Sequence, residues 1–499
     1  MKYRRRHLSR GFLTLEIMIA LVLMTLSITA VILVAFGNQD TLVGGETNAE
    51  AVQKAGEMLE VAQALARKDF SIVNPIATST DGIYHSSLSV GSVSPSDYLS
   101  KKVTAHVTWT DDRALPHEVS LSSLVTNFTN ASGGDTCSSV LVGDWVHPQI
   151  VNIETDLATL TGGATGDYLV TGLNAYKGKL YITSNNSSVN SETFFIFNVE
   201  DSANPTFIAK RDNDVNATGL NAVTVAPHVS DGKMYAYVAS ASSFPKGQLQ
   251  VFDVSDVSDP HLVNFQNGNT VFKIATTTVS GGSSNGIGKS IFYKNGYVYL
   301  GLTKPSSGPE FNIIDVREPT NPSWIGGFTV GNTVSAINVR GRYAYLATPN
   351  SQELIILDIS NPSSPVQIGG FNAAVGAGSG KSMYLVGDKL YFGETIPNAG
   401  PEFYVFDIGT PTHPQAIGSR EISQSANGLI VRDFLAFLLT NSELHILNIV
   451  DPDVITVFAS PLTLPGSVSS GGSSLDCEGN TLYAGTNTHG KLYIITSTP

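Results

Sequence analysis

Two short strings in the chain look like the loop that binds phosphate in nucleotide-binding proteins. They read GIGKS at 286–290 and GSGKS at 378–382. A P-loop also needs a Gly at the first position of Gly-x-x-x-x-Gly-Lys-Ser/Thr, where this chain has Ser283 and Val375. A strand is predicted after each string, whereas a P-loop needs a helix. We therefore exclude nucleotide binding at both strings.

A pair of cations remains from these strings, Lys289 and Lys381. Each lies ten residues before an aromatic residue, Tyr299 or Tyr391, that recurs through the chain. Their matching positions predict matching places in a repeated structure. An anion is the ligand that two lysines at one site favour.

The sequence contains no enzyme signature. Ten His are scattered along it, and no His-Glu-x-x-His zinc pattern occurs. We predict no catalytic residues, no metal and no cofactor. A site assembled from distant repeats would leave no local signature, so a surface hydrolase or lyase stays as an alternative.

Four acidic residues recur before tight turns, and turn capping by a short acceptor is the favoured interpretation. The recurring residues are Asp253, Asp315, Asp358 and Asp407. Calcium binding is the alternative, and it is weak because no Asp-x-Asp-x-Asp-Gly run accompanies these residues.

One pattern of elements positions these residues. An apolar strand, a Gly-containing turn, an aromatic-rich strand, a polar loop and a strand ending in Asp or Asn recur, as in VFDVSDVSDP at 251–260 and IIDVREPTNP at 313–322. The aromatic of the second strand recurs at Tyr181, Tyr237, Tyr299, Tyr345, Tyr391, Phe437 and Tyr483, and the last four intervals are 46 residues each. About four short strands per repeat is typical of a propeller blade, so the seven aromatics predict an all-β seven-bladed propeller.

The last repeat has three strands, and a strand before the first repeat supplies the fourth. Residues 148–152 resemble the outer strands of other repeats, so this N-terminal strand is predicted to close the ring. Cys137 and Cys477 would then both lie near the closure. A disulfide between them is the favoured interpretation, and two separate thiols are the alternative.

The repeat resembles the LVIVD-repeat β-propellers over residues 145–499. In such a propeller, the loops between second and third strands share one face with the connections between blades. Here that face has the long, variable segments, so binding is predicted there. Lys289 and Lys381 are candidate residues of this face, at the rim of the central channel.

Charge narrows the class of ligand. The chain has 29 Lys and Arg against 42 Asp and Glu, a formal net charge of -13. An acidic body repels phosphate backbones, so we expect no nucleic-acid partner.

The first residues form a separate signal. Residues 1–11 read MKYRRRHLSRG, and the 25 residues 12–36 form a hydrophobic run whose one charge is Glu16. This run is long enough to span a bilayer, with the basic segment in the cytoplasm and the C-terminus outside. A basic leader, Gly11, Phe12 and a Glu at the fifth position after the Gly resemble the type IV prepilins.

That resemblance implies cleavage between Gly11 and Phe12 by a prepilin peptidase, with methylation of the new N-terminus. Glu16 would offset the terminal amine of a neighbouring pilin subunit during filament assembly. The predicted partners are other pilin subunits, the peptidase, the cytoplasmic membrane before assembly, and an extracellular protein or glycan.

Residues 37–128 are predicted to complete an α+β pilin-like domain, in which the long N-terminal helix continues to about residue 68 over a three-stranded antiparallel meander. Residues 129–136 read as a linker, and 137–499 as the propeller. The predicted protein is a minor pilin-like subunit, first single-pass in the membrane and then on a pilus or the cell surface, that presents a propeller for adhesion or for protein or glycan binding. A pseudopilin of a type II-like secretion system is the alternative.

Overall fold

A computed structural model of the chain separates it into two compact units, residues 1–128 and 129–499. The structure describes residues 45–68, 73–92, 100–110, 114–126, 136–137, 141–154, 169–185, 193–211, 219–228, 230–241, 247–263, 271–272, 286–306, 308–349, 352–372, 378–396, 400–465, 472–486 and 491–498.

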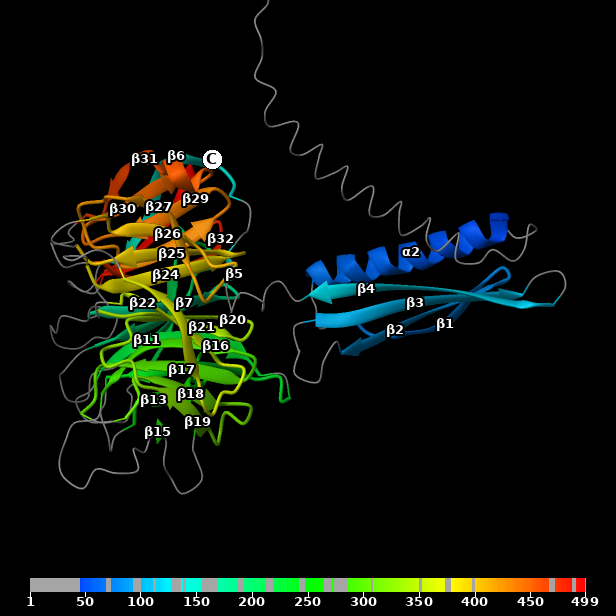
Figure 1. Cartoon of the computed structure of the whole chain (residues 1–499), viewed down its shortest axis with the longest axis horizontal. Helices are drawn as coiled ribbons and strands as arrows, with labels where there is room; N and C mark the ends of the chain where they lie inside the picture. The colour runs from blue at the N-terminus through cyan, green and yellow to red at the C-terminus, as the bar shows by residue number, and fades with distance from the viewer. Residues whose placement is uncertain are drawn as a thin grey trace, which may run out of the picture. The chain divides into compact units, whose positions relative to one another are not determined.

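The first unit packs one helix on one antiparallel sheet (Figure 1). Its elements are α2 (Gly45–Lys68), β1 (Ile76–Asp81), β2 (Tyr84–Ser92), β3 (Ser100–Thr110) and β4 (Pro116–Thr126), and the strands pair in chain order. The helix buries Ala51, Ala55 and Ala62 against the sheet. Alternate β3 residues, among them Val103 and Val107, complete this core.

The predicted α+β fold with a long N-terminal helix is wrong. Among the described residues, which are almost entirely β, the one α-helix begins at Gly45, and the sheet that it covers has four strands rather than three. The segment 12–36 lies outside the described residues, as do residues 127–135 around the predicted linker.

The predicted single-pass membrane placement, followed by a pilus or cell-surface location, is also corrected. No helix in the part of the chain that the structure describes is both long and apolar enough to cross a membrane. The helix α2 carries Glu50, Lys54, Glu57 and Glu60 among its apolar residues, which is typical of a helix with one face on a core.

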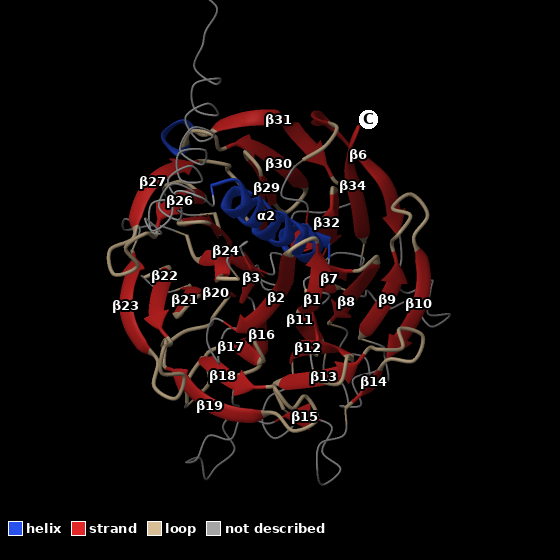
Figure 2. Cartoon of the chain, turned by 90° about the vertical axis from the view of Figure 1, so that its right-hand side faces the viewer, coloured by secondary structure: helices blue, strands red, loops and turns tan. Residues whose placement is uncertain are grey.

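The second unit is a β-propeller (Figure 2). Its described residues form seven sheets around a common axis, and each sheet is an antiparallel meander of four strands, with added short strands in two of them. We number these blades in chain order. The repeat segment of the sequence therefore folds as the propeller that its pattern predicts.

The first four blades have the following strands. Blade 1 contains β7 (Val170–Tyr176), β8 (Lys179–Ser184), β9 (Phe194–Asn198) and β10 (Thr206–Arg211); blade 2 contains β11 (Leu220–Pro227), β12 (Met234–Ser240), β13 (Leu249–Asp253), β14 (His261–Leu262) and β15 (Val271–Phe272); blade 3 contains β16 (Gly288–Lys294), β17 (Tyr297–Leu302), β18 (Phe311–Asp315) and β19 (Ser323–Phe328); blade 4 contains β20 (Ala336–Arg340), β21 (Tyr343–Ala347), β22 (Leu354–Asp358) and β23 (Val366–Phe371).

The remaining blades follow the same order. Blade 5 contains β24 (Gly380–Val386), β25 (Lys389–Glu394), β26 (Phe403–Asp407) and β27 (Gln415–Arg420); blade 6 contains β28 (Gly428–Arg432), β29 (Leu435–Leu439), β30 (Glu443–Asn448), a 3-10 turn η2 (Pro452–Val454) and β31 (Thr456–Thr463); blade 7 contains β5 (Thr136–Cys137), β32 (Gly472–Gly479), β33 (Thr481–Thr486), β34 (Leu492–Thr498) and β6 (Asp144–Glu154).

The inner strands of successive blades contact one another around the axis, and β32 of blade 7 contacts β7 of blade 1. Each recurring aromatic lies on the second strand of its blade and is buried between sheets, as Tyr237, Tyr345 and Phe437 illustrate. Apolar clusters that join adjacent sheets form the core, so the blades support each other through their faces.

The ring is closed by segments from both ends of the unit. The strand β6, from before the first blade, pairs with β34, placing Ile150 opposite Ile495. The short strand β5 adds to the inner strand β32, and a disulfide joins Cys137 to Cys477, with 5.2 Å between their Cα atoms. The strands β5 and β6, which precede blade 1 in the sequence, therefore form the two edge strands of blade 7.

Candidate anion-binding site in the propeller channel

One irregularity recurs where the inner strands begin. In five blades the register of the first strand skips a residue, which leaves a bulge at Thr171, Asn221, Lys289, Lys381 and Ser473. In blades 4 and 6 the corresponding positions are Ser335 and Asn427, each directly before the inner strand. We call these seven polar residues the bulge ring.

Four members of the bulge ring are tied to other parts of the propeller. The Thr171 hydroxyl donates to the carbonyl of Leu220 (2.6 Å), and the Asn221 amide donates to the carbonyl of Gly288 (2.6 Å). The hydroxyl of Ser473 donates to the carbonyl of Val170, and the amide of Asn427 donates to Asn441 (2.8 Å). Three of these bonds reach the inner strand of the next blade, which places the bulge ring where inner strands meet at the channel.

Blades 3 and 5 make that link with a different residue. The serine after each lysine donates to the next inner strand: Ser290 to the carbonyl of Val334 (2.8 Å), and Ser382 to that of Ala426 (2.7 Å). Because the serine makes the bond, the preceding lysine is left out of it.

The glycine before each lysine packs against the preceding blade. A Cβ on Gly288 would lie 2.7 Å from the carbonyl oxygen of Gln248, and one on Gly380 would lie 2.6 Å from that of Glu353. In each Gly-Lys-Ser string, the Gly allows close packing on the preceding blade, the Ser bonds to the next blade, and the Lys takes part in neither contact. These packing roles account for the strings without a P-loop.

Lys289 and Lys381 are half-buried, and within the part of the chain that the structure describes neither amine has a hydrogen-bond or ion-pair partner. Burial lowers the pKa of Lys289. Burial also lowers the pKa of Lys381, and the positive charge of Lys289 lowers it further. Blade 4 separates the two lysine-bearing blades, and the two lysines are near enough for the charge of Lys289 to act on Lys381.

The bulge ring lies at the end of the channel where the loops between second and third strands begin. The backbone N–H of Thr303, which opens the β17–β18 loop, donates to the carbonyl of Ile287 (2.9 Å), and Thr395 at the start of the β25–β26 loop donates to Ser379 (2.9 Å). We call this end the loop face. The two sequence-predicted lysines thus stand at the loop face.

The recurring aspartates have a structural role. The side chains of Asp253, Asp315, Asp358 and Asp407 each accept the backbone N–H two residues later, at 2.8 to 3.0 Å. This geometry confirms the turn-capping interpretation.

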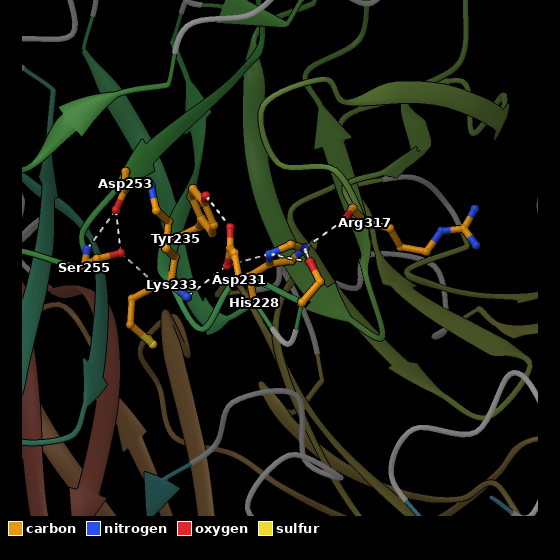
Figure 3. Close-up of polar contacts among 9 residues, drawn as sticks. His228, Asp231, Lys233, Tyr235, Asp253, Ser255 and Arg317 are labelled. Carbon is orange, nitrogen blue, oxygen red and sulfur yellow. Dashed lines mark hydrogen bonds and ion pairs between the residues drawn. The ribbon is translucent and has the colours of Figure 1, made fainter. Parts of the chain in front are cut away.

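A group of hydrogen-bonded polar residues around His228 in blade 2 is also structural (Figure 3). The Nδ1 of His228 lies 2.8 Å from Asp231, and its Nε2 lies 2.9 Å from the carbonyl oxygen of Arg317 in blade 3. Tyr235 donates to Asp231 (3.0 Å), while Lys233 pairs with Asp253 (2.9 Å). Because both ring nitrogens of His228 are engaged within the protein, the cluster joins two blades and offers no free base.

Sequence reasoning missed Glu394, a carboxyl that is fully buried between blades 4 and 5. Neither of its oxygens has a hydrogen bond of normal geometry. Burial raises its pKa to about 7, the nearby Glu353 and Glu402 add to the rise, and the backbone N–H of Gly378 opposes it. Comparison of the repeats could have found it, because the residue three positions after the recurring aromatic is Thr in blades 4, 6 and 7, for example Thr348, and Glu394 in blade 5.

The predicted processing and assembly residues, Gly11, Phe12 and Glu16, lie outside the described residues. Of the sequence-predicted site residues, the structure brings together two pairs, Lys289 with Lys381 and Cys137 with Cys477.

Comparison with known proteins identifies LVIVD repeats in the propeller. The LVIVD repeat model matches residues 229–266 and 331–373, which overlap blades 2 and 4. No curated protein matches the chain.

Three solved structures resemble the chain distantly. The N-terminal domain of Nup159 is 13% identical with a TM-score of 0.40, over 73% of this chain and 99% of that one. A Lactobacillus plantarum protein is 14% identical with a TM-score of 0.44, over 60% and 86%. BamB from Moraxella catarrhalis is 15% identical with a TM-score of 0.38, over 66% and 83%. Similarity at this level assigns no function.

Proposed function

We propose that the propeller is a binding module and that its ligand, a protein or a glycan, docks on the loop face. The observation that carries the proposal is the bulge ring, which places polar side chains from all seven blades at the channel end surrounded by the irregular loops. Loops on a rigid scaffold are where binding usually occurs.

The contrast between the two ends of the channel supports this choice of face. At the opposite end, the turns between first and second strands are short, for example Tyr176–Lys179 and Arg340–Tyr343. The turns after the third strands at that end are capped by aspartates such as Asp358. At the loop face, the β25–β26 loop carries Ile396, whose side chain is 58% exposed. An exposed aliphatic side chain beside polar groups is typical of an interaction surface.

The test compares the two faces with matched substitutions in the full chain. Ile396→Asp changes the loop face, and Val386→Asp changes an equally aliphatic, 44% exposed residue at the opposite end of blade 5. Both variants should fold, because both side chains are exposed. In a screen of immobilised glycans and surface proteins, we expect Ile396→Asp to weaken capture about tenfold or more and Val386→Asp to leave it unchanged.

The opposite pattern would place the binding surface at the other end of the propeller. Equal loss in both variants would point to nonspecific adsorption and would contradict the proposal.

We also propose that the N-terminus is processed as a prepilin, which would make pilin-like subunits and a prepilin peptidase the partners of this chain. The support is the sequence alone: the basic leader, Gly11, Phe12 and Glu16. Intact-mass analysis of the protein from its native source should give a chain that begins at a methylated Phe12. A chain that retains residues 1–11 would contradict this part of the proposal, whether the assembly is a pilus or a secretion pseudopilus.

A further inference from the structure

We infer that Lys289, Ser335 and Lys381 form a binding site for one oxyanionic group, a carboxylate, sulfate or phosphate carried by the ligand. This inference rests on the proposed function, since it names the chemistry that the loop face recognises. The three residues belong to three consecutive blades, so together they form one arc of the bulge ring.

The arc is distinguished by what its side chains do not contact. The other four ring members make hydrogen bonds to neighbouring blades or loops. Within the described residues, the side chains of Lys289, Ser335 and Lys381 make none, although all three are half-buried. Polar groups at such depth are normally paired, so an arc that the described residues leave unpaired is suited to a ligand.

The local construction explains why the arc is unpaired. In blades 3 and 5, Ser290 and Ser382 bond the next inner strand, and this is the bond that Thr171 and Asn221 make from the bulge position in blades 1 and 2. In both blades the serine makes the bond in place of the lysine before it. The lysines of blades 3 and 5, on either side of Ser335 in blade 4, therefore do not take part in this bond.

Electrostatics defines the sign of the partner. Two ammonium groups that are partly withdrawn from water and repel each other destabilise the empty site, and one anion between them relieves both costs. Among the described groups, the charge that acts on Lys381 is that of Lys289, and no carboxylate is paired with either. In a chain with a net charge of -13, this arc offers an unneutralised positive site.

The site also predicts a linkage between anion binding and protons. Burial lowers the pKa of both lysines, the charge of Lys289 lowers that of Lys381 further, and a bound anion opposes both effects. Binding should therefore take up protons as the pH approaches the lowered pKa values, and affinity should fall as the pH rises. A pair of fully solvated lysines would show no such dependence below pH 9.

The experiment is calorimetric titration of the full chain with sodium sulfate, sodium phosphate and sodium acetate at constant ionic strength. Lys289→Met and Lys381→Met remove each charge at similar volume. Lys304→Met is the matched control, because Lys304 is an exposed lysine of the β17–β18 loop and not a member of the bulge ring. Each channel variant should weaken binding of the preferred anion about tenfold, equivalent to about 1.4 kcal/mol, and the double variant should abolish it.

Three readouts keep the outcome clear. The channel variants should unfold at the same or higher temperature than the wild type, because each removes an unpaired, partly buried charge. Ser335→Ala should weaken binding two- to threefold. Stronger binding of sulfate and phosphate than acetate would indicate a sulfated or phosphorylated ligand, and the reverse would indicate a carboxylate.

Unchanged affinity in the double variant, or equal loss in Lys304→Met, would overturn the inference. This failure is distinct from failure of the proposed function. If the double variant still captures the macromolecular ligand and Ile396→Asp does not, the loop face binds but the arc is not the anion site.

Discussion

At the scale of single residues, a polar side chain without a hydrogen bond lowers the stability of a protein interior. Among the described residues of the propeller, the channel lysines and Glu394 are two different cases. The channel lysines are half-buried and retain a route to solvent or a ligand. Glu394 is fully buried with no hydrogen bond of normal geometry, in a place where blade 4 has Thr348 donating to the carbonyl of Gln352 (2.9 Å). Burial of this kind favours the protonated form of a carboxyl.

Glu394 predicts a fall in stability as the pH rises. Its folded pKa of about 7 is above the ordinary value of 4.5, so between these values the folded state holds a proton that the unfolded state has released. Stability is therefore lost as the pH rises from 4.5 through 7, by about 3 kcal/mol for a shift of this size. The Glu394→Gln variant lacks this titration.

Urea unfolding of the wild type and Glu394→Gln at pH 5, 6, 7 and 8 measures the effect. The variant should gain on the wild type steadily across the series, by about 2 to 3 kcal/mol at pH 8 relative to pH 5. Comparing the two proteins removes the contribution of the other acids, which titrate in both. Parallel curves would show that Glu394 is already ionised in the folded protein.

At the scale of elements, the blades are joined by a contact between each outer strand and the turn of the next blade. A Cβ on Gly326, Gly369 or Gly418 would collide with the carbonyl of Pro362, Pro411 or Pro452. These glycines lie in β19, β23 and β27. The prolines follow turns of the next blade that are capped by Asp358, Asp407 and Asn448. The recurring Pro in the sequence thus packs on a recurring Gly one blade earlier.

Gly369→Ala should therefore destabilise the propeller by about 1–3 kcal/mol, because the added methyl meets backbone that cannot rotate away. Gly409→Ala, in the turn of blade 5 that Gly369 contacts, is the matched control. Its φ is not in the left-handed region, and its new Cβ would meet only the Asp407 carboxylate, at 3.1 Å. Thermal unfolding should separate the two variants by several degrees. Equal midpoints would mean that the blades move apart readily at their outer edges.

At the scale of the whole molecule, the ring is a closed structure whose order could be derived from the sequence. The constant 46-residue spacing of Tyr345, Tyr391 and Phe437 predicted repeats of equal length, and each of these repeats forms one four-stranded blade. The strand before the first blade was identifiable because it repeats the outer-strand pattern. The offset of Lys289 and Lys381 from the recurring aromatics likewise placed both at the start of inner strands.

Other features were not accessible from the pattern. The unpaired state of the lysines depends on hydrogen bonds from Ser290 and Ser382 to the next blade, which no local spacing encodes. The buried position of Glu394 depends on which face of β25 meets blade 4. In the first unit, the fourth strand of the sheet, β1 (Ile76–Asp81), was not predicted from the sequence.

The most direct test of the central claim is X-ray diffraction from crystals of the full chain soaked in sodium selenate, with data collected at the selenium absorption edge. Selenate has the shape and charge of sulfate, and its anomalous signal locates it without reference to the protein. The account predicts an anomalous peak within hydrogen-bonding distance of both lysine amines and the Ser335 hydroxyl, absent from the Lys289→Met/Lys381→Met variant. Selenate bound only at other surfaces, with the channel mouth empty of it, would contradict the account.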